Sequence, residues 1–204
     1  MKKTLLNILV VLAISITWTL KAQNDNQEFD ETFTQADLSI LTGNVQRPNG
    51  IGWVNDTIYA VCNGDWTVYE IDDTNGDTRT YIHGIRNSHD LHAEENENGS
   101  IELWIPDYEQ NTLFLVNPAR SPQVITDNLE SPWGIEVLDE ETFIITNLGN
   151  DSIVTTTRSG EITVLNSDMR SPAGITVNED FVFVANNGSA RRAIEWFDRG
   201  EIAE

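Results

Sequence analysis

The stretch ESPWGIEV at residues 130–137 is one of four versions of the same phrase in this chain. The others are QRPNGIGW at 46–53, RNSHDLHA at 86–93 and RSPAGITV at 170–177. Aligned on Gly-Ile or its counterpart Asp-Leu, the copies are 40, 44 and 40 residues apart. An apolar run that ends in Asn or Asp follows each copy, and these runs end at Asn63, Asp107, Asn147 and Asn186. Two landmarks in phase four times indicate a repeat architecture with a period near 40 residues.

Each repeat contains three or four short strands separated by turn residues. In the first repeat we expect strands over 50–54, 57–63, 67–72 and 78–82, with an Asn-Gly hairpin signal before the last. No part of the chain after the N-terminal segment shows a sustained apolar period of 3.6 residues, so minimal helix is expected. Antiparallel meanders joined by tight turns are typical of propeller blades. The sequence therefore predicts an all-β fold, a β-propeller of four-stranded antiparallel blades.

The phrase also resembles a known family. PNGIGW, SPWGIEV and SPAGITV, each followed by a short strand ending in Asn or Asp, are similar to NHL repeats. The same pattern marks the six-bladed propellers that include the SMP-30/gluconolactonase family and streptogramin lyase. The resemblance covers residues 36–204 and implies a propeller whose relatives include both enzymes and pure binding modules.

Four repeats are fewer than the six that the resemblance implies. ADLSILTGN at 36–44 aligns with GEITVLNSD at 160–168, so an extra outer strand is expected before the first repeat, paired with the last blade. The fourth repeat reaches GEIAE at 200–204, where its own outer strand would begin. A closed four-bladed ring is one interpretation. We favour the other, a chain that is incomplete at its C-terminal end and forms part of a six-bladed ring.

The ends of the chain divide it into three expected segments. Residues 1–22 join the basic start MKK to an uncharged apolar stretch, which is the pattern of a signal peptide. An uncleaved N-terminal anchor is the alternative for this segment. Residues 23–36 are polar and acidic and indicate a flexible leader, and residues 37–204 hold the propeller. A signal peptide implies a secreted or periplasmic protein.

The charge of the chain disfavours two classes of partner. All three lysines lie in residues 1–22, so the remainder carries nine arginines against 33 acidic residues, a net charge of −24. Such a surface repels nucleic acid and anionic membranes, so we expect no nucleic-acid partner and no membrane contact beyond an uncleaved anchor. Cys62 is the single cysteine, which excludes an intramolecular disulfide, and its apolar surroundings favour a buried, inert thiol.

Candidate site residues lie at the start of each phrase. The position before Gly-Ile holds Asn49, His89, Trp133 and Ala173. If the blades surround a common axis, these four lie at equivalent heights around the mouth of its channel. Trp133 there is a platform for a sugar ring or a peptide, or else packs between blades. Asn49 matches by motif the Asn that ligates metal in the lactonase family, and otherwise is a turn residue before glycine.

Ser88-His89-Asp90-Leu91-His92 is the most unusual version of the phrase, because it holds two of the three histidines. His89 with Asn49 is a candidate site for a divalent metal, calcium or zinc, and His89 is also a candidate catalytic base. Asp90 and His92 are candidate ligand-binding residues that strand alternation places on one face, opposite His89. The alternative is a polar strand start that hydrogen-bonds the neighbouring blade.

Two functions from different classes remain. The first is a secreted binding module that recruits a protein or a carbohydrate or other small ligand at the propeller face. The second is a metal-dependent lactonase- or lyase-type enzyme that works at the channel mouth. We favour the first, because the partner motif Pro-Asp-Gly of the lactonase ligand set is absent.

Overall fold

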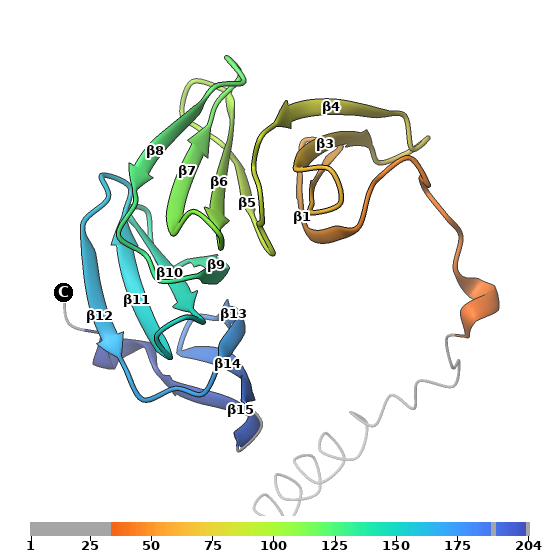
Figure 1. Ribbon diagram of the computed structural model, residues 1–204. Coiled ribbons are helices and arrows are strands. Elements are labelled where there is room, and N and C mark those ends of the chain that lie inside the picture. Colours follow the sequence, from red (N-terminus) through yellow and green to blue (C-terminus); the bar gives the residue numbers. More distant parts are fainter. Residues whose placement is uncertain (1–33, 189–190, 203–204) are drawn as a thin grey trace, which may run out of the picture. The chain divides into compact units, whose positions relative to one another are not determined.

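The computed structural model describes residues 34–188 and 191–202 (Figure 1). The predicted signal peptide and residues 23–33 of the predicted leader lie outside the described residues. The chain divides after Ile40 into two units, and every described strand belongs to the second. In the first unit Gln35–Asp37 form a single 3-10 turn, η1. No helix among the described residues has the length and apolar character needed to cross a membrane.

The second unit is a β-propeller in which each sheet is an up-and-down meander (Figure 1). The first blade consists of β1 (Pro48–Val54), β2 (Thr57–Cys62), β3 (Thr67–Asp72) and β4 (Thr78–His83). The second consists of β5 (His92–Glu95), β6 (Ile101–Asp107), β7 (Thr112–Val116) and β8 (Pro122–Thr126). The third consists of β9 (Pro132–Val137), β10 (Thr142–Asn147), β11 (Ser152–Thr157) and β12 (Ile162–Asn166). The fourth consists of β13 (Pro172–Val177), β14 (Phe181–Gly188) and β15 (Arg191–Asp198), and the 3-10 turn η2 (Arg199–Glu201) follows it.

The predicted all-β propeller with minimal helix is confirmed, since the helical structure of the described residues consists of the two 3-10 turns. The prediction of an outer strand at 36–44 is wrong. Residues 38–47 form no strand, and among the described residues β15 pairs only with β14. Instead, the Thr42 hydroxyl lies 2.8 Å from that of Thr78, and Val45 packs on the buried Cys62. The apolar side chains that suggested a strand, those of Leu38, Ile40 and Leu41, are exposed.

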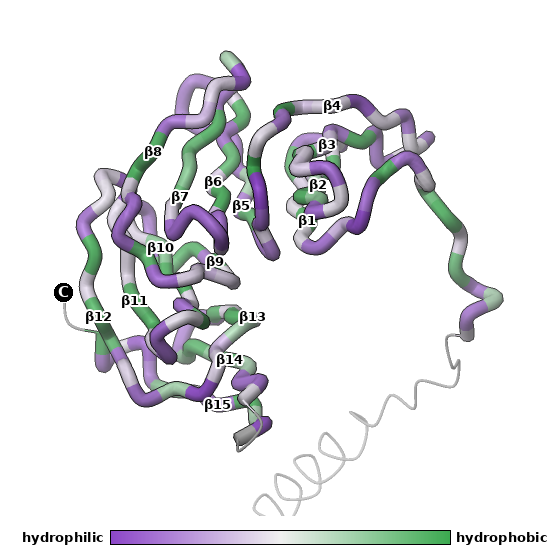
Figure 2. The backbone as a smooth tube through the Cα atoms, in the orientation of Figure 1, coloured by the Kyte–Doolittle hydropathy of each residue, from purple (hydrophilic) through white to green (hydrophobic). Residues whose placement is uncertain are grey.

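Each large apolar cluster is shared by two neighbouring blades. Tyr59 and Val61 of the first blade pack against Leu103 of the second, Trp104 of the second against Phe143 of the third, and Ile144 of the third against Val184 of the fourth. Figure 2 shows hydrophobic stretches within the strands and hydrophilic residues at many of the turns that join them. Because a single blade cannot bury both of its faces, the packing between neighbours holds the blades in order.

The glycine of the phrase is required by the approach of the next blade. A Cβ added to Gly50 would lie 2.5 Å from the Cα of Asp90, and one added to Gly134 would lie 2.5 Å from the carbonyl oxygen of Ala173. Both contacts are with backbone, which cannot move aside as a flexible side chain can. Inner strands β1 and β9 therefore carry glycine where they meet the following blade.

In the second, third and fourth blades, the Asn or Asp that ends the second strand holds the segment before the inner strand, whereas the Asn63 side chain of the first blade donates to Asn87. Oδ1 of Asn147 accepts a hydrogen bond from the backbone N–H of Glu130 at 3.2 Å, and Oδ1 of Asn186 accepts one from that of Arg170 at 3.0 Å. Oδ2 of Asp107 accepts from the N–H of Arg86 at 2.8 Å. The side chain at the end of the second strand thus ties down the segment that leads into the inner strand. This contact explains why the two landmarks recur in phase.

Candidate functional site

The inner strands begin with an irregularity that turns one residue out of the sheet. The pairing register shifts between Pro48 and Gly50 in the first blade, and corresponding shifts occur at the starts of β9 and β13. Asn49 and Trp133 lie within the shifted segments, and His89 precedes the ordered part of β5. Bulges of this kind are common beside functional sites because they re-aim a side chain.

Three of the four predicted mouth residues are brought together. The amide nitrogen of Asn49 lies 3.4 Å from Nδ1 of His89. The imidazole of His89 lies flat on the indole of Trp133, with ring centroids 3.5 Å apart and planes 6° from parallel. Ala173, by contrast, is buried and contributes only its backbone carbonyl, which accepts a hydrogen bond from Thr146 at 2.6 Å.

A third ring completes this group. Tyr108 meets both His89 and Trp133 edge to face, with centroid distances of 5.8 and 5.9 Å. We call His89, Tyr108 and Trp133 the aromatic cluster; all three side chains are half-buried. Sequence reasoning missed Tyr108. Its signal was present, because it follows the landmark Asp107 at a position that holds Gly64, Leu148 and Asn187 in the other blades.

The histidine of the aromatic cluster favours its neutral form. Burial lowers the pKa of His89, and the nearby charge of Asp107 only partly opposes this. Because the Asn49 amide nitrogen faces Nδ1 as a donor, the ring proton belongs on Nε2 in this arrangement. A neutral imidazole in this position accepts and donates hydrogen bonds and presents an uncharged face for stacking.

Asp90 and His92 both point toward the third blade, away from the aromatic cluster. Oδ2 of Asp90 accepts a hydrogen bond from the backbone of Ile135 at 3.2 Å, and burial raises the pKa of this carboxyl to about 6. Nε2 of His92 lies 3.2 Å from Glu94, and the His92 ring centroid lies 5.9 Å from that of Phe143 in the third blade. Both side chains therefore serve the junction between the second and third blades.

The residues present do not fit the metal site that the family resemblance implies. Asn49 and His89 are two donors whose side chains face each other, while Asp90 and His92 turn elsewhere. Within the described ranges no group of three or more His, Cys, Asp or Glu side chains is placed to hold a metal ion.

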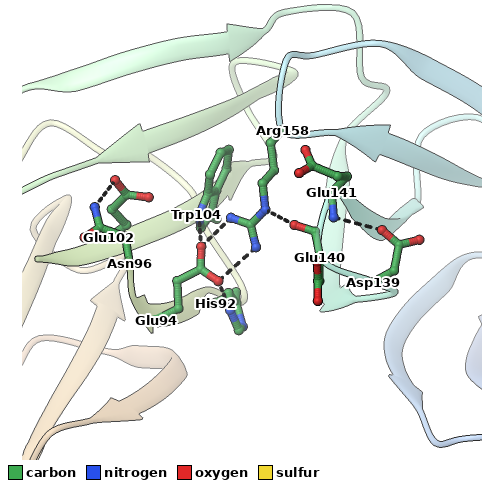
Figure 3. A network of polar contacts seen from close by, with 9 residues as sticks. All are labelled: His92, Glu94, Asn96, Glu102, Trp104, Asp139, Glu140, Glu141 and Arg158. Atoms are coloured by element: carbon green, nitrogen blue, oxygen red, sulfur yellow. Dashed lines mark hydrogen bonds and ion pairs between the residues drawn. The ribbon is translucent and has the colours of Figure 1, made fainter. Parts of the chain in front are cut away.

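A polar network between the second and third blades centres on Glu94 and Arg158 (Figure 3). The guanidinium of Arg158 contacts both carboxylate oxygens of Glu94, one of them at 2.9 Å, and lies over the rings of Trp104 and Phe143. Although burial opposes it, hydrogen bonds from Arg158 and Trp104 lower the pKa of Glu94. This network borders an acidic pocket of about 540 Å³ and joins the two blades.

Comparison with known proteins supports the fold but assigns the chain to no family. No protein-family model matches the sequence, and no curated protein matches it. A nidogen/laminin complex contains a similar structure, with a TM-score of 0.62, 17% identity, and coverage of 75% of this chain and 61% of that one. A catalytically inactive variant of virginiamycin B lyase from Staphylococcus aureus with quinupristin is also similar, at a TM-score of 0.58, 18% identity, and coverage of 78% and 58%. A streptogramin B lyase matches with a TM-score of 0.54, 17% identity, and coverage of 78% and 56%.

These likenesses agree with the blades described above. The chain is a β-propeller. It spans about three fifths of the length of these three solved structures. Because one of them is named in a protein complex and two are named as lyases, the fold accommodates both binding and catalysis.

Proposed function

We propose that this chain is a secreted or periplasmic binding module that recruits a protein or glycan at the aromatic cluster. The observation that carries the proposal is the parallel stack of His89 on Trp133, closed at the edge by Tyr108. Each ring comes from a different turn or strand start, so the group is held in place before any ligand arrives. Rigid aromatic surfaces of this kind lose little conformational entropy on binding and are enriched among binding hot spots.

Two further observations support a binding role. Asn49 adds an exposed amide beside the rings, which suits the hydroxyl and peptide groups of glycans and proteins. The nidogen/laminin complex shows that a propeller of similar fold takes part in a protein complex.

The test is a binding screen of the full chain on arrays of immobilised oligosaccharides and peptides. Trp133→Ala is expected to weaken any specific binding by about 30-fold, which corresponds to the roughly 2 kcal/mol of a hot-spot residue. Trp196→Ala, at an exposed tryptophan of β15 outside the aromatic cluster, is the matched control and should bind normally. Specific binding that is unchanged in Trp133→Ala, or no specific binding on either array, would contradict the proposal.

A lyase is the second candidate, and the neutral His89 favours it. An uncharged imidazole can accept a proton at neutral pH, here on Nδ1 once the Asn49 amide moves away from that nitrogen. Incubation of the chain with quinupristin, the compound named with the virginiamycin B lyase, followed by chromatography, separates the two functions. The binding proposal predicts no conversion. Conversion that disappears in His89→Ala would replace it with the lyase.

A further inference from the structure

The junction between the first and second blades departs from the pattern of the other two junctions. The residue just before β7 is Asn111 and the one before β11 is Asp151, both in the left-handed backbone region with φ of 56° and 57°. Oδ1 of Asn111 accepts a hydrogen bond from the backbone N–H of Ser131 at 2.8 Å, and Oδ1 of Asp151 accepts one from Ser171 at 2.6 Å. A short polar side chain thus links each of these blades to the next.

The corresponding residue before β3 is Trp66. Its backbone is in the same left-handed region, with φ of 59°, and its carbonyl still accepts from Gly84 at 2.8 Å. Asn and Asp adopt this conformation readily, whereas a bulky side chain there is an outlier that costs energy. The indole accepts no hydrogen bond, and half of the side chain is exposed (50%). At the other two junctions this position holds an Asn or Asp whose side chain accepts a stabilising hydrogen bond. Residues that cost stability without an evident structural gain are found at functional sites, so Trp66 is a candidate functional residue.

A pocket of about 390 Å³ opens at this junction. It adjoins the aromatic cluster through His89, and its other lining includes Arg47, Asn49, Asn63, Trp66, Arg86 and Asn87. We call it the Arg–Trp pocket. The amides are already ordered, since Asn63 donates to Oδ1 of Asn87 at 2.6 Å and Asn49 faces His89 at 3.4 Å.

The charge of the Arg–Trp pocket opposes that of the chain. Two of the nine arginines line it, although the whole sequence has a net charge of −21. Arg86 lies 6.0 Å from the Trp66 ring centroid and forms a long, exposed ion pair with Glu109 at 3.6 Å. Arg47 forms no ion pair within the described part of the chain and is exposed. Glu109 therefore leaves one positive charge in the pocket uncompensated.

We propose that the Arg–Trp pocket binds an acidic sugar, with its carboxylate held by Arg47 and Arg86 and its ring against Trp66. Guanidinium groups match the planar geometry of a carboxylate, and an indole face provides the apolar platform on which a sugar ring packs. The amides of Asn49, Asn63 and Asn87 supply both donors and acceptors for hydroxyl groups. The pocket shares His89 with the aromatic cluster, so this proposal names a ligand class for the binding module and rests on the proposed function; Trp133→Ala, which removes the ring stacked on His89, is expected to weaken uronate binding as well.

The test uses a panel of uronate oligosaccharides, each paired with its methyl ester, which keeps the sugar ring but removes the charge. Calorimetric titration of the full chain is expected to show binding to at least one uronate. Its methyl ester should bind at least tenfold more weakly. Arg47→Gln combined with Arg86→Gln should weaken uronate binding at least tenfold. Equal affinity for acid and ester, or no uronate bound, would overturn the proposal.

Trp66→Asn is the sharpest variant, because it installs the residue that stands at the next junction. The melting temperature is expected to rise, since the strain is relieved and the backbone N–H of Asn87, whose bond to Asp107 is long at 3.4 Å, gains a second acceptor. Uronate binding should nevertheless fall at least tenfold, a combination that a purely structural role for Trp66 does not produce. Unchanged binding would overturn the assignment of Trp66.

The two proposals fail in different ways. Array ligands that depend on Trp133, without any uronate binding, would remove the acidic-sugar proposal and leave the binding module in place. The absence of specific binding to all probes would remove both.

Discussion

Asp90 occupies, in the second blade, the position that glycine holds in the other three. Because the side chain at this position faces the next blade, the carboxylate enters the junction, where Oδ2 meets the backbone of Ile135 and Oδ1 meets that of Leu91. The hydrogen bonds lower its pKa, but burial outweighs them and raises it to about 6 from 3.8. The folded chain therefore holds this proton at pH values where the unfolded chain has released it.

This difference predicts a pH dependence. The contribution of Asp90 to stability is greatest below about pH 4 and is lost as the pH rises through about 6, above which the carboxylate is charged in both states. In Asp90→Asn that decline is absent. The free energy of unfolding of the variant, relative to wild type, should therefore rise by about 2–3 kcal/mol between pH 4 and pH 7. Urea titrations across this range measure it.

The control is Asp127→Asn, which changes an exposed aspartate in the loop after β8. Its stability relative to wild type should stay level over the same interval. A flat profile for Asp90→Asn as well would show that the buried carboxylate does not titrate in this range.

Among the elements, the inner strands carry a repeated glycine that is buried in two blades and exposed in a third. Gly50 and Gly134 are buried against the backbone of the following blade, whereas Gly174 is exposed and a Cβ there would meet only Ala185, at 3.9 Å. The repeat preserves glycine at all three positions, but within the described residues only the first two are enclosed. The chain thus contains its own control for the packing role of this residue.

Substitution by alanine should separate these positions. Gly50→Ala and Gly134→Ala are each expected to lower the free energy of unfolding by about 3 kcal/mol, since the methyl group is forced against backbone atoms. Gly174→Ala should change it by roughly 0.5 kcal/mol or less. Chemical denaturation of the three variants makes the comparison. A loss at Gly174 as large as that at Gly50 would mean that another surface covers the fourth blade.

For the whole molecule, the shared clusters and the excess of acidic residues act in opposite directions. Stability comes from contacts between adjacent blades, each with its own apolar cluster. A net charge of −21 spread over one chain disfavours the compact state through repulsion between like charges. At neutral pH the repulsion between acidic residues therefore offsets part of the stability that the apolar clusters provide.

Salt is therefore expected to stabilise this protein. Raising sodium chloride from about 20 mM to about 500 mM shortens the screening length and should raise the melting temperature at pH 7. The same addition near the isoelectric point, about 4.2, should have little effect, because the repulsion is largely absent there. An equal shift at both pH values would point to a general salt effect rather than to the charge of the chain. Differential scanning fluorimetry measures both.

A structural feature can be predicted from the sequence when it is determined by interactions between residues that are close together in the chain. Strand positions follow from alternation and turn residues, which are local, so 67–72 was predicted with the observed bounds and the other strands of the first blade to within about two residues. The neighbourhood of Asn49, His89 and Trp133 was predictable too, because equivalent positions of successive repeats occupy equivalent places around an axis. The prediction of a strand at 36–44 failed because a strand also needs a neighbour that pairs with its backbone, and the pattern of apolar residues says nothing of that partner.

Side chains that differ from one repeat to the next cannot be placed from the sequence pattern alone. The position of Tyr108 against Trp133, the direction of Asp90, and the pocket beside Trp66 all depend on contacts between residues of different blades, some 20 to 45 positions apart. A periodic pattern specifies what the repeats have in common, since every copy must pack on its neighbour in the same way. Side chains that break the pattern find their partners only when the blades are assembled, and those are the side chains that form the candidate sites.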